Sequence, residues 1–472
     1  MGPHSGRASA PHDLSSELVD RCASRTQTWC PHPAHPMRGE HVPSIDAVPQ
    51  YADMPHPVGQ WQEFIGMAQG REAMFRFSLN GEEALWLNDP ELMRATLMAP
   101  FSQVGLGPLI RGFEKAGGLG NALTVNFGES WRGRRRVVQR PLTHKGVRQL
   151  GLLIQRSLDE GIAAWEPTSE FRVAEAVTNL ILDVIGVTLF SGDHREFREV
   201  IHAFDDERNA AFVAISQDAS YDPRSRKEFA DALAALDSFI VGVIADRRQE
   251  PRDDLLSHIV AASTSDGESL SDGELRDELV GLIYAGHKTT ANTLIFALWL
   301  LATHSDIQQA LAGEAAAIPL DDEFHAVFEE RAPLSAEVIT ETLRLYPVGD
   351  LIDRAVVGDF TLAGVDLPVG MPIIFSTWIP HRAQSTYDAP TEFRPGRHRP
   401  GVMSPDQRGA YLPFSTGPKV CLGVHLATFE GALALALIAR RWSVSADVDT
   451  VDVAHDPLLF ADPSLRLSLA RR

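Results

Sequence analysis

One stretch of this sequence constrains its interpretation more than any other. It is Phe414-Ser-Thr-Gly-Pro-Lys-Val-Cys-Leu-Gly423, followed directly by the apolar run VHLATFEGALALALIARRW. The run predicts a long final helix that begins at about Leu422, so Cys421 lies at a helix N-terminus, where backbone N–H groups stabilise a thiolate and lower its pKa. Glycines on both sides let backbone amides approach the sulfur. Such a thiolate can bind iron and donate electron density to it; a buried structural cysteine is the alternative.

The stretch resembles the cysteine-ligand loop of the cytochrome P450 family, whose pattern is Phe-x-x-Gly-x-Arg-x-Cys-x-Gly. Phe414, Gly417, Cys421 and Gly423 match it. Lys419 stands where the family usually has Arg or His; it keeps a positive charge near a haem propionate but lacks the bidentate fork of Arg. The resemblance implies haem b with the Cys421 thiolate as axial ligand of the iron. It also implies a mainly α fold with minor β (α+β), in which a long central helix lies over the haem and a small sheet region lies near the N-terminal side.

Two further motifs of this family have counterparts in the chain. Glu341 and Arg344 are three residues apart, so they share a helix face and can form a buried ionic network. In the family an arginine from a later segment joins this pair, and Arg394 or Arg397 resembles it; the role looks structural.

The second motif pairs a tryptophan with an arginine. Trp131 and Arg135 are four residues apart on a predicted helix, and they resemble a family pair that contacts a haem propionate. Arg354 resembles a third propionate contact. For each, a surface side chain is the alternative.

A final match lies in a long predicted helix, at Ala285-Gly286-His-Lys-Thr289-Thr. Ala285 and Gly286 are small enough to leave space above a flat cofactor, and the Thr289 hydroxyl can bond a helix carbonyl or an oxygen species. The alternative is an ordinary core helix with back-bonded threonines. In the family, the threonine and an acid before it help to deliver protons.

Lys288 replaces that acid. A lysine does not accept and pass protons at neutral pH unless burial lowers its pKa. Two hypotheses follow. Either the Lys288 ammonium pairs with an acid, for example within Asp205-Asp206-Glu207, which keeps the architecture with reversed polarity. Or the relay is altered, and the reaction uses water-mediated proton delivery or an oxidation without a standard hydroxylation step.

The N-terminal part of the chain divides into a tail and a strand region. Residues 1–44 lack apolar periodicity and read as a disordered tail, and residues 45–472 read as one catalytic domain. Segments 74–81 and 83–88 flank Gly81 as a hairpin would, and Asp89 and Pro90 open a helix through Met98. The glycine-rich residues 99–127 predict a long loop.

The rest of the chain predicts helices first and strands later. Residues 128–345 are mostly helical in pattern, and within them 173–190 predicts a buried helix. The segment after Ser271 runs for more than thirty residues without proline and predicts one long helix. Strands are expected over 354–377, followed by a Pro- and Arg-rich irregular region.

Composition excludes several classes of function. The net charge of −20 disfavours nucleic acid and anionic membranes as partners. The three cysteines, Cys22, Cys30 and Cys421, do not form a disulfide framework, and the first residues lack the apolar stretch of a signal peptide or anchor. A monomeric cytoplasmic protein is expected.

The resemblance implies a monooxygenase that hydroxylates or epoxidises an apolar or amphiphilic small molecule, often in natural-product metabolism. Its electrons would come from a ferredoxin or flavodoxin, which outward arginines of RGRRRVVQR (132–140) could attract. The pocket would draw on residues 99–127, 195–215, 281–290, 348–353 and 459–460. Asp350 and Asp353 are expected to face solvent rather than substrate. A peroxide-driven or coupling enzyme and a haem-based sensor are the alternatives.

Overall fold

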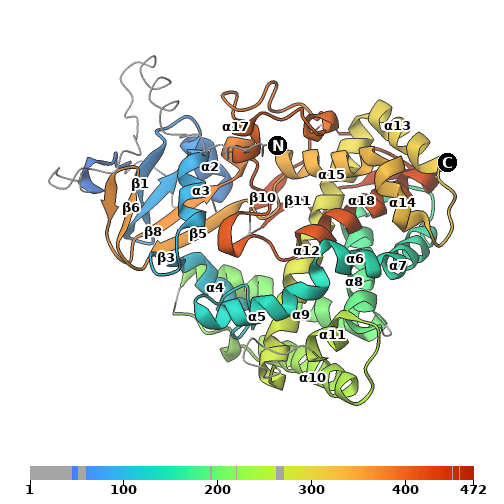
Figure 1. The fold of residues 1–472 in the computed structure, drawn as a ribbon, viewed down its shortest axis with the longest axis horizontal. Helices are drawn as coiled ribbons and strands as arrows, with labels where there is room; N and C mark the ends of the chain where they lie inside the picture. The colour runs from blue at the N-terminus through green and yellow to red at the C-terminus, as the bar shows by residue number, and fades with distance from the viewer. Residues whose placement is uncertain are drawn as a thin grey trace, which may run out of the picture.

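The computed structural model describes residues 45–51, 60–191, 194–218, 220–261, 270–448, 450–455 and 458–472. The tail predicted over residues 1–44 lies outside these ranges. Within them the chain is mainly helical with small sheets, as expected. Figure 1 shows a sheet region on the left and a larger helical region on the right and below, with α12 running through the middle.

The described α-helices are α2 (Trp61–Ala68), α3 (Pro90–Met98), α4 (Pro108–Gly117), α5 (Glu129–Gln139), α6 (His144–Gln149), α7 (Gly151–Ala163), α8 (Val173–Phe190), α9 (His194–Gln217), α10 (Lys227–Gln249), α11 (Leu255–Ala261), α12 (Asp272–Thr303), α13 (Ser305–Ala316), α14 (Phe324–Arg331), α15 (Pro333–Leu345), α16 (Trp378–His381), α17 (Pro405–Ala410) and α18 (Val424–Arg441). The described strands are β1 (Met74–Leu79), β2 (Glu82–Leu87), β3 (Val104–Leu106), β4 (Thr168–Phe171), β5 (Leu351–Val356), β6 (Phe360–Leu362), β7 (Val365–Leu367), β8 (Pro372–Ser376), β9 (Trp442–Ser445), β10 (Val453–His455), β11 (Leu459–Ala461) and β12 (Leu467–Arg471).

The predicted hairpin is confirmed. β1 and β2 pair antiparallel, and the turn between them places Asn80 and Gly81 at φ of 53° and 85°. Two consecutive positive φ values are what a tight two-residue hairpin requires. The sheet is less local than expected, because its order is β1-β2-β8-β5-β3 and β2 pairs parallel with β8. Strands from distant parts of the chain therefore build one five-stranded sheet, coloured blue and orange in Figure 1.

The long loop expected over residues 99–127 is wrong in part. The segment contains β3 and the ten-residue helix α4. This helix has Pro108 at its first position, and the residue after its end, Gly118, adopts the left-handed conformation. Proline at the start and glycine just past the end are ordinary helix boundaries. The many glycines of the segment concealed both signals.

The two core helices are confirmed. α12 has 32 residues and starts with a capping box in which Ser271 and Glu274 bond each other's backbone N–H groups. α8 packs beside it. By length and composition α8 could cross a membrane, but 61% of it is buried inside the protein, as in a core helix. The final helix, α18, begins at Val424, two residues after its expected start.

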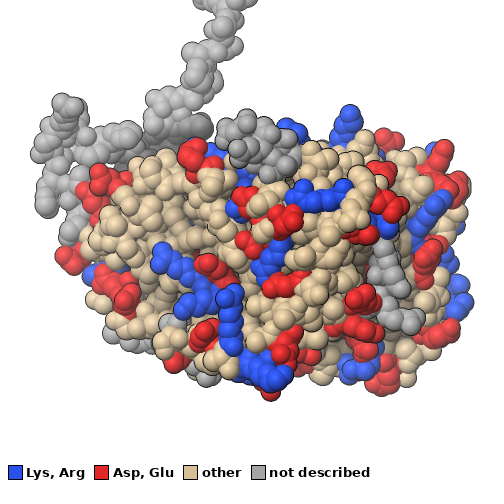
Figure 2. Space-filling model, turned by 90° about the horizontal axis from the view of Figure 1, so that it is seen from below, with Lys and Arg blue, Asp and Glu red and all other residues tan. Residues whose placement is uncertain are grey.

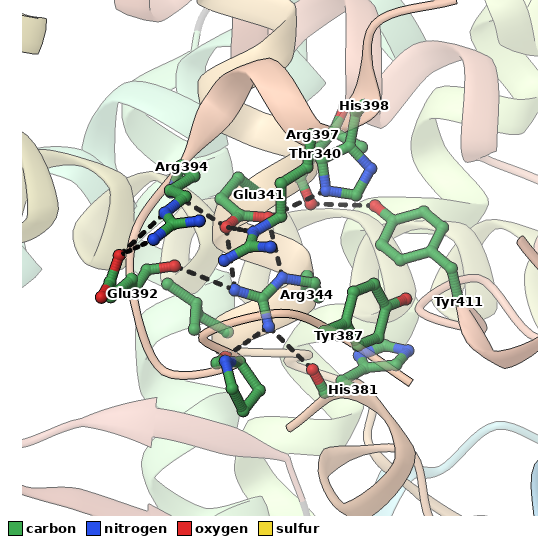
Figure 3. Close-up of polar contacts among 12 residues, drawn as sticks. Thr340, Glu341, Arg344, His381, Tyr387, Glu392, Arg394, Arg397, His398 and Tyr411 are labelled. Atoms are coloured by element: carbon green, nitrogen blue, oxygen red, sulfur yellow. Dashed lines mark hydrogen bonds and ion pairs between the residues drawn. The ribbon is translucent and has the colours of Figure 1, made fainter. Parts of the chain in front are cut away.

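An ionic network ties α15 to the irregular region that leads to Cys421 (Figure 3). Glu341 and Arg344 are fully buried and meet through two bonds of 2.8 Å. The two candidate arginines differ: Arg397 Nε donates to Glu341 at 3.2 Å, whereas Arg394 reaches Glu341 only through its backbone N–H. His398 is a further partner of Glu341, at 2.9 Å. Arg397 is therefore the later arginine that joins the Glu341–Arg344 pair, and His398 adds a second bond to Glu341.

The network also fixes backbone. Arg344 donates to the carbonyls of His381, Pro390 and Glu392 at 2.7, 2.6 and 3.1 Å. The imidazole of His381 in turn accepts from the backbone N–H of Leu412 at 2.9 Å. Burial lowers the pKa of His381 to about 3, and nearby cations act in the same direction, so the ring is neutral and can accept this bond.

Replacing Glu341 by Gln is expected to lower the free energy of unfolding by about 3–5 kcal/mol, because Arg344 then remains buried without its charge partner. The control is Glu337→Gln on the same helix, which removes an ion pair with an Arg399 side chain that is 60% exposed and is expected to cost at most about 1 kcal/mol. Denaturant unfolding followed by circular dichroism measures both.

The difference in the free energy of unfolding between the wild-type protein and Glu341→Gln should become smaller at acidic pH. Burial alone would raise the pKa of Glu341, but bonds from Arg344 and His398 lower it below its ordinary value of 4.5. A lowered carboxyl pKa stabilises the folded state above the unfolded-state pKa, and this stabilisation is lost as the pH falls through the folded-state pKa. Equal losses of unfolding free energy in Glu341→Gln and Glu337→Gln at neutral pH would show that Glu341 is not the essential charge partner of buried Arg344.

Candidate active site

The loop before α18 presents the Cys421 thiol. The backbone N–H of Cys421 donates to the carbonyl of Phe414 at 2.9 Å, which closes the loop. Gly417 has φ of 72°, and a Cβ there would lie 2.4 Å from the carbonyl oxygen of Leu97 in α3. Glycine is therefore required at this position, because the loop packs directly on the backbone of α3.

The thiol itself differs from the expectation. Protein atoms surround Cys421 densely enough that burial raises the pKa of its thiol, and the backbone N–H of Gly423 and the charge of Arg135 only partly oppose this. The backbone contribution expected at the helix N-terminus is present, but burial outweighs it, so the net direction of the pKa shift is opposite to the prediction. The residue nevertheless keeps accessible surface, so the sulfur can be reached by a ligand.

Trp131, Arg135 and Lys419 meet beside the cysteine loop. Arg135 donates to the carbonyl of Val420 at 2.7 Å, the residue before Cys421. The indole of Trp131 and the ammonium of Lys419 both donate to the carbonyl of Leu123, at 3.2 and 2.7 Å. Lys419 also donates to the carbonyl of Asn126 at 2.9 Å. Three predicted residues from two distant segments, α5 and the cysteine loop, are therefore brought together.

Arg354 joins this corner from β5. Its guanidinium lies 5.9 Å from the centre of the Phe127 ring, and Lys419 lies 4.4 Å from the same ring. Burial lowers the pKa of Lys419 to about 7, and the charges of Arg354 and Arg135 add to this, while Glu278 opposes it weakly. The corner therefore holds an excess of positive charge next to an accessible thiol. This donor set fits haem, whose two propionates would meet the cations and whose iron would meet the sulfur.

α12 carries the small residues expected near a cofactor. Ala285 is exposed and Thr289 half-buried, although His287 and Thr290 beside them are buried. The Thr289 hydroxyl donates to the carbonyl of Ala285 at 2.6 Å, so its oxygen lone pairs remain available. A Cβ at Gly286 would lie 3.4 Å from Ile185 in α8, an ordinary contact distance, so packing against α8 does not require glycine at this position. The catalytic role of Gly286 stays a prediction.

Lys288 has an acidic partner, as the first hypothesis predicted. Its ammonium lies 3.2 Å from Asp205 Oδ2, across from α12 on α9. Of the three acids considered, Asp206 is exposed and Glu207 pairs with Arg226 at 3.0 Å. The sequence had not indicated two other members of the cluster, His287 and Arg208, which also contact Asp205.

The solvent-facing positions expected for Asp350 and Asp353 are wrong, because both side chains are buried. Asp350 accepts a hydrogen bond from the Ser376 hydroxyl. Asp353 Oδ2 accepts from the backbone N–H groups of Leu109 and Ile110 at 2.7 and 3.4 Å and so caps α4. The two acids therefore tie β5 and the turn before it to Ser376 and to the start of α4.

The family model described as "Cytochrome P450" matches residues 40–469. The chain belongs to the cytochrome P450 family. It is therefore a haem-thiolate monooxygenase that acts on a small molecule and takes electrons from a redox partner.

Bacterial P450 proteins are among its relatives. The chain is 30% identical over 413 residues to cyclooctat-9-en-7-ol 5-monooxygenase of Streptomyces melanosporofaciens. The aligned region covers 82% of this chain and 86% of that protein. It is 29% identical to pentalenene oxygenase of Streptomyces avermitilis, with 75% and 80% covered. The crystal structure of the cytochrome P450DA heme domain shares its fold, with a TM-score of 0.76, 19% identity and 90% and 98% of the two chains covered.

Replacing Lys419 by Met is expected to loosen residues 121–128, because the segment loses two charge-assisted bonds to the carbonyls of Leu123 and Asn126. Hydrogen exchange of these amides should accelerate on the order of tenfold. Lys145→Met, at an exposed position of α6, is the control and should leave them unchanged. Unchanged exchange in Lys419→Met would show that the ammonium does not hold the segment.

Proposed function

We propose that residues 45–472 form the catalytic domain of a P450 that hydroxylates or epoxidises an apolar or amphiphilic terpenoid in natural-product metabolism. The names of two relatives support the substrate class, since cyclooctat-9-en-7-ol 5-monooxygenase and pentalenene oxygenase act on compounds of this kind. The observation that carries the proposal is the accessible Cys421 thiol beside the cation cluster of Lys419, Arg135 and Arg354.

Each part of the site has a proposed role. When bound, the haem supplies dioxygen activation with two electrons from outside the chain. Cys421 is the metal ligand, and Phe414, Gly417 and Gly423 shape its loop. The remaining cofactor contacts come from four segments and are Trp131, Arg135, Arg354, Lys419 and Ala285. Thr289 is proposed to bond oxygen species, and Gly286 is proposed to leave space beside Ala285 above the cofactor.

The electron donor is proposed to be an acidic ferredoxin or flavodoxin. In the run 132–140, Arg134 and Arg135 turn inward, whereas Arg132, Arg136 and Arg140 are exposed. Figure 2 shows basic and acidic side chains intermixed on one face of the molecule. Glu129 offsets the charge of Arg132, so Arg136 and Arg140, close in sequence to the cysteine-loop contact of Arg135, are the arginines proposed to attract an acidic partner. A cytoplasmic monomer is proposed.

A peroxide-driven or oxidative-coupling enzyme is the second candidate. The observation in its favour is Lys288, because no acid stands at that position of α12. Product formation with hydrogen peroxide at the rate supported by dioxygen and a ferredoxin would favour this reading.

Replacing Cys421 by Ser is expected to abolish the optical signature of a thiolate-bound ferrous–CO haem and to abolish monooxygenase activity, because a hydroxyl donates far less electron density to iron. Cys22→Ser and Cys30→Ser, at the two cysteines of the N-terminal tail, are the matched controls and should keep both. A Cys421→Ser protein with an unchanged thiolate spectrum would refute the ligand assignment.

The substrate class is tested by optical titration of the ferric protein with terpenoids, polyketides, steroids, aromatic amino acids and small peptides. Displacement of water from the iron shifts the haem band, so the same experiment verifies haem binding. A saturable shift is expected with polycyclic terpenes or their alcohols. Saturable shifts confined to peptides or aromatic amino acids would overturn the terpenoid assignment and leave the P450 assignment intact.

A further inference from the structure

Glu278 of α12 is a buried carboxylate that links this helix to α5 and to the segment 118–126. Its side chain is only 2% exposed. Oε2 accepts from the backbone N–H of Leu123 at 3.2 Å, and Oε1 lies 3.4 Å from a guanidinium nitrogen of Arg134 in α5. Arg134 also donates to the carbonyl of Asn121 at 2.7 Å. α12 and α5 therefore hold the same short stretch of backbone.

A glycine marks how closely this stretch approaches α12. Asp277, the residue before Glu278, accepts from the backbone N–H of Asn121 at 2.8 Å. A Cβ at Gly120 would lie 2.2 Å from Asp277 Oδ1, and Gly120 has a φ of 54°. Glycine is required there, because the carboxylate lies directly against the backbone in a left-handed conformation. The course of the segment is therefore set by its bonds to α12.

Leu123 joins Glu278 to the cation corner. While its N–H binds Glu278, its carbonyl accepts from the Trp131 indole at 3.2 Å and from the Lys419 ammonium at 2.7 Å. An ammonium has three N–H donors, and the carbonyls of Leu123 and Asn126 take two of those of Lys419. The direction of the third N–H therefore depends on where Leu123 is held.

Glu278 also contributes charge to the corner. Burial raises its pKa to about 7 and Asp277 acts in the same direction, while a backbone N–H and Arg134 oppose the shift. Above pH 7 the side chain is therefore mostly an anion. Its charge acts on Lys419, and residues 118–126, which lie against it, include no charged side chain. Glu278 thus opposes the excess positive charge of the corner.

We propose that Glu278 is a positioning residue for the haem: it fixes Leu123 behind the propionate-binding donors, and its charge lowers the reduction potential of the iron. The inference rests on the proposed function, through the cofactor contacts of Lys419, Arg135 and Arg354. Reduction of ferric to ferrous haem takes one electron from the redox partner and lowers the charge of the site by one. Nearby cations favour this step and nearby anions oppose it. Because Glu278 is buried, water and salt screen its charge only weakly.

The test is a ferric–ferrous redox titration of haem-loaded protein at pH 8. In Glu278→Gln the amide oxygen still accepts from the N–H of Leu123, but the charge is lost. At a fixed potential, the ratio of ferrous to ferric haem should be at least about threefold higher than in the wild-type protein. An unchanged ratio overturns the inference.

Glu274→Gln is the matched control. This residue also pairs with Arg134, at 3.0 Å, but its side chain is 38% exposed, and glutamine can keep the capping box with Ser271. Because water screens the charge of Glu274, the control should change the ratio much less. Equal changes in Glu274→Gln and Glu278→Gln overturn the specific role of Glu278.

Hydrogen exchange in the same proteins separates position from charge. Glu278→Met has no acceptor for the N–H of Leu123, so exchange of the amides of residues 121–123 should accelerate about fivefold. In Glu278→Gln these amides should exchange at the wild-type rate although the potential has shifted. Unchanged exchange in Glu278→Met overturns the positioning role. Accelerated exchange in Glu278→Gln overturns the charge role, because the shift in potential then follows from a loosened segment.

Lys419→Met separates the inference from the proposed function. Loss of a cation beside a propionate should lower the ratio of ferrous to ferric haem at a fixed potential. If Lys419→Met lowers this ratio and Glu278→Gln leaves it unchanged, only the inference fails. If Lys419→Met changes neither the potential nor the rate at which haem dissociates, the proposed propionate contact is wrong, and the inference fails with it.

Discussion

A charge removed from water must find an opposite charge or a set of hydrogen bonds, and Arg344 is the residue at which this constraint organises the molecule. Its guanidinium is fully buried, and after bonding Glu341 it still has donors that must be satisfied. The carbonyls of His381 and Pro390 accept them. Through the neutral His381 ring and the N–H of Leu412, the constraint reaches the cysteine loop.

Two other groups of charged side chains, one around Asp205 and one around Lys419, satisfy the same constraint in different ways. Around Asp205 the basic groups are each in direct contact with one carboxylate. Around Lys419 they are not, because Arg135 and Arg354 add to its charge and its own bonds go to neutral carbonyls. Unmatched buried charge is unfavourable in a protein interior unless a ligand balances it. The contrast distinguishes the corner that binds an anionic cofactor from the clusters that connect helices.

Features that depend on neighbouring residues were predictable from the sequence, and features that depend on distant ones were not. The hairpin around Gly81 and the helix that opens at Asp89 and Pro90 are local signals, and the structure contains both. α4 was missed because the glycines around it concealed its local boundary signals, and the carboxylate that caps it, Asp353, lies more than 240 residues later. The parallel pairing of β2 with β8 has the same origin. Asp205 could be proposed as the partner of Lys288 only as one of three adjacent acids, and the fold selects it because it alone is buried and faces α12.

At Cys421, features of the local sequence and the packing of the fold shift the pKa of the thiol in opposite directions. Its position before α18 and the N–H of Gly423 favour a thiolate, and these are the features that the sequence displays. Burial, which depends on how α3 and α5 pack around the loop, outweighs them and raises the pKa of the thiol. A metal ion bound at the sulfur reverses this balance, because its charge favours the deprotonated form. Cofactor binding and loss of the thiol proton are therefore one coupled event.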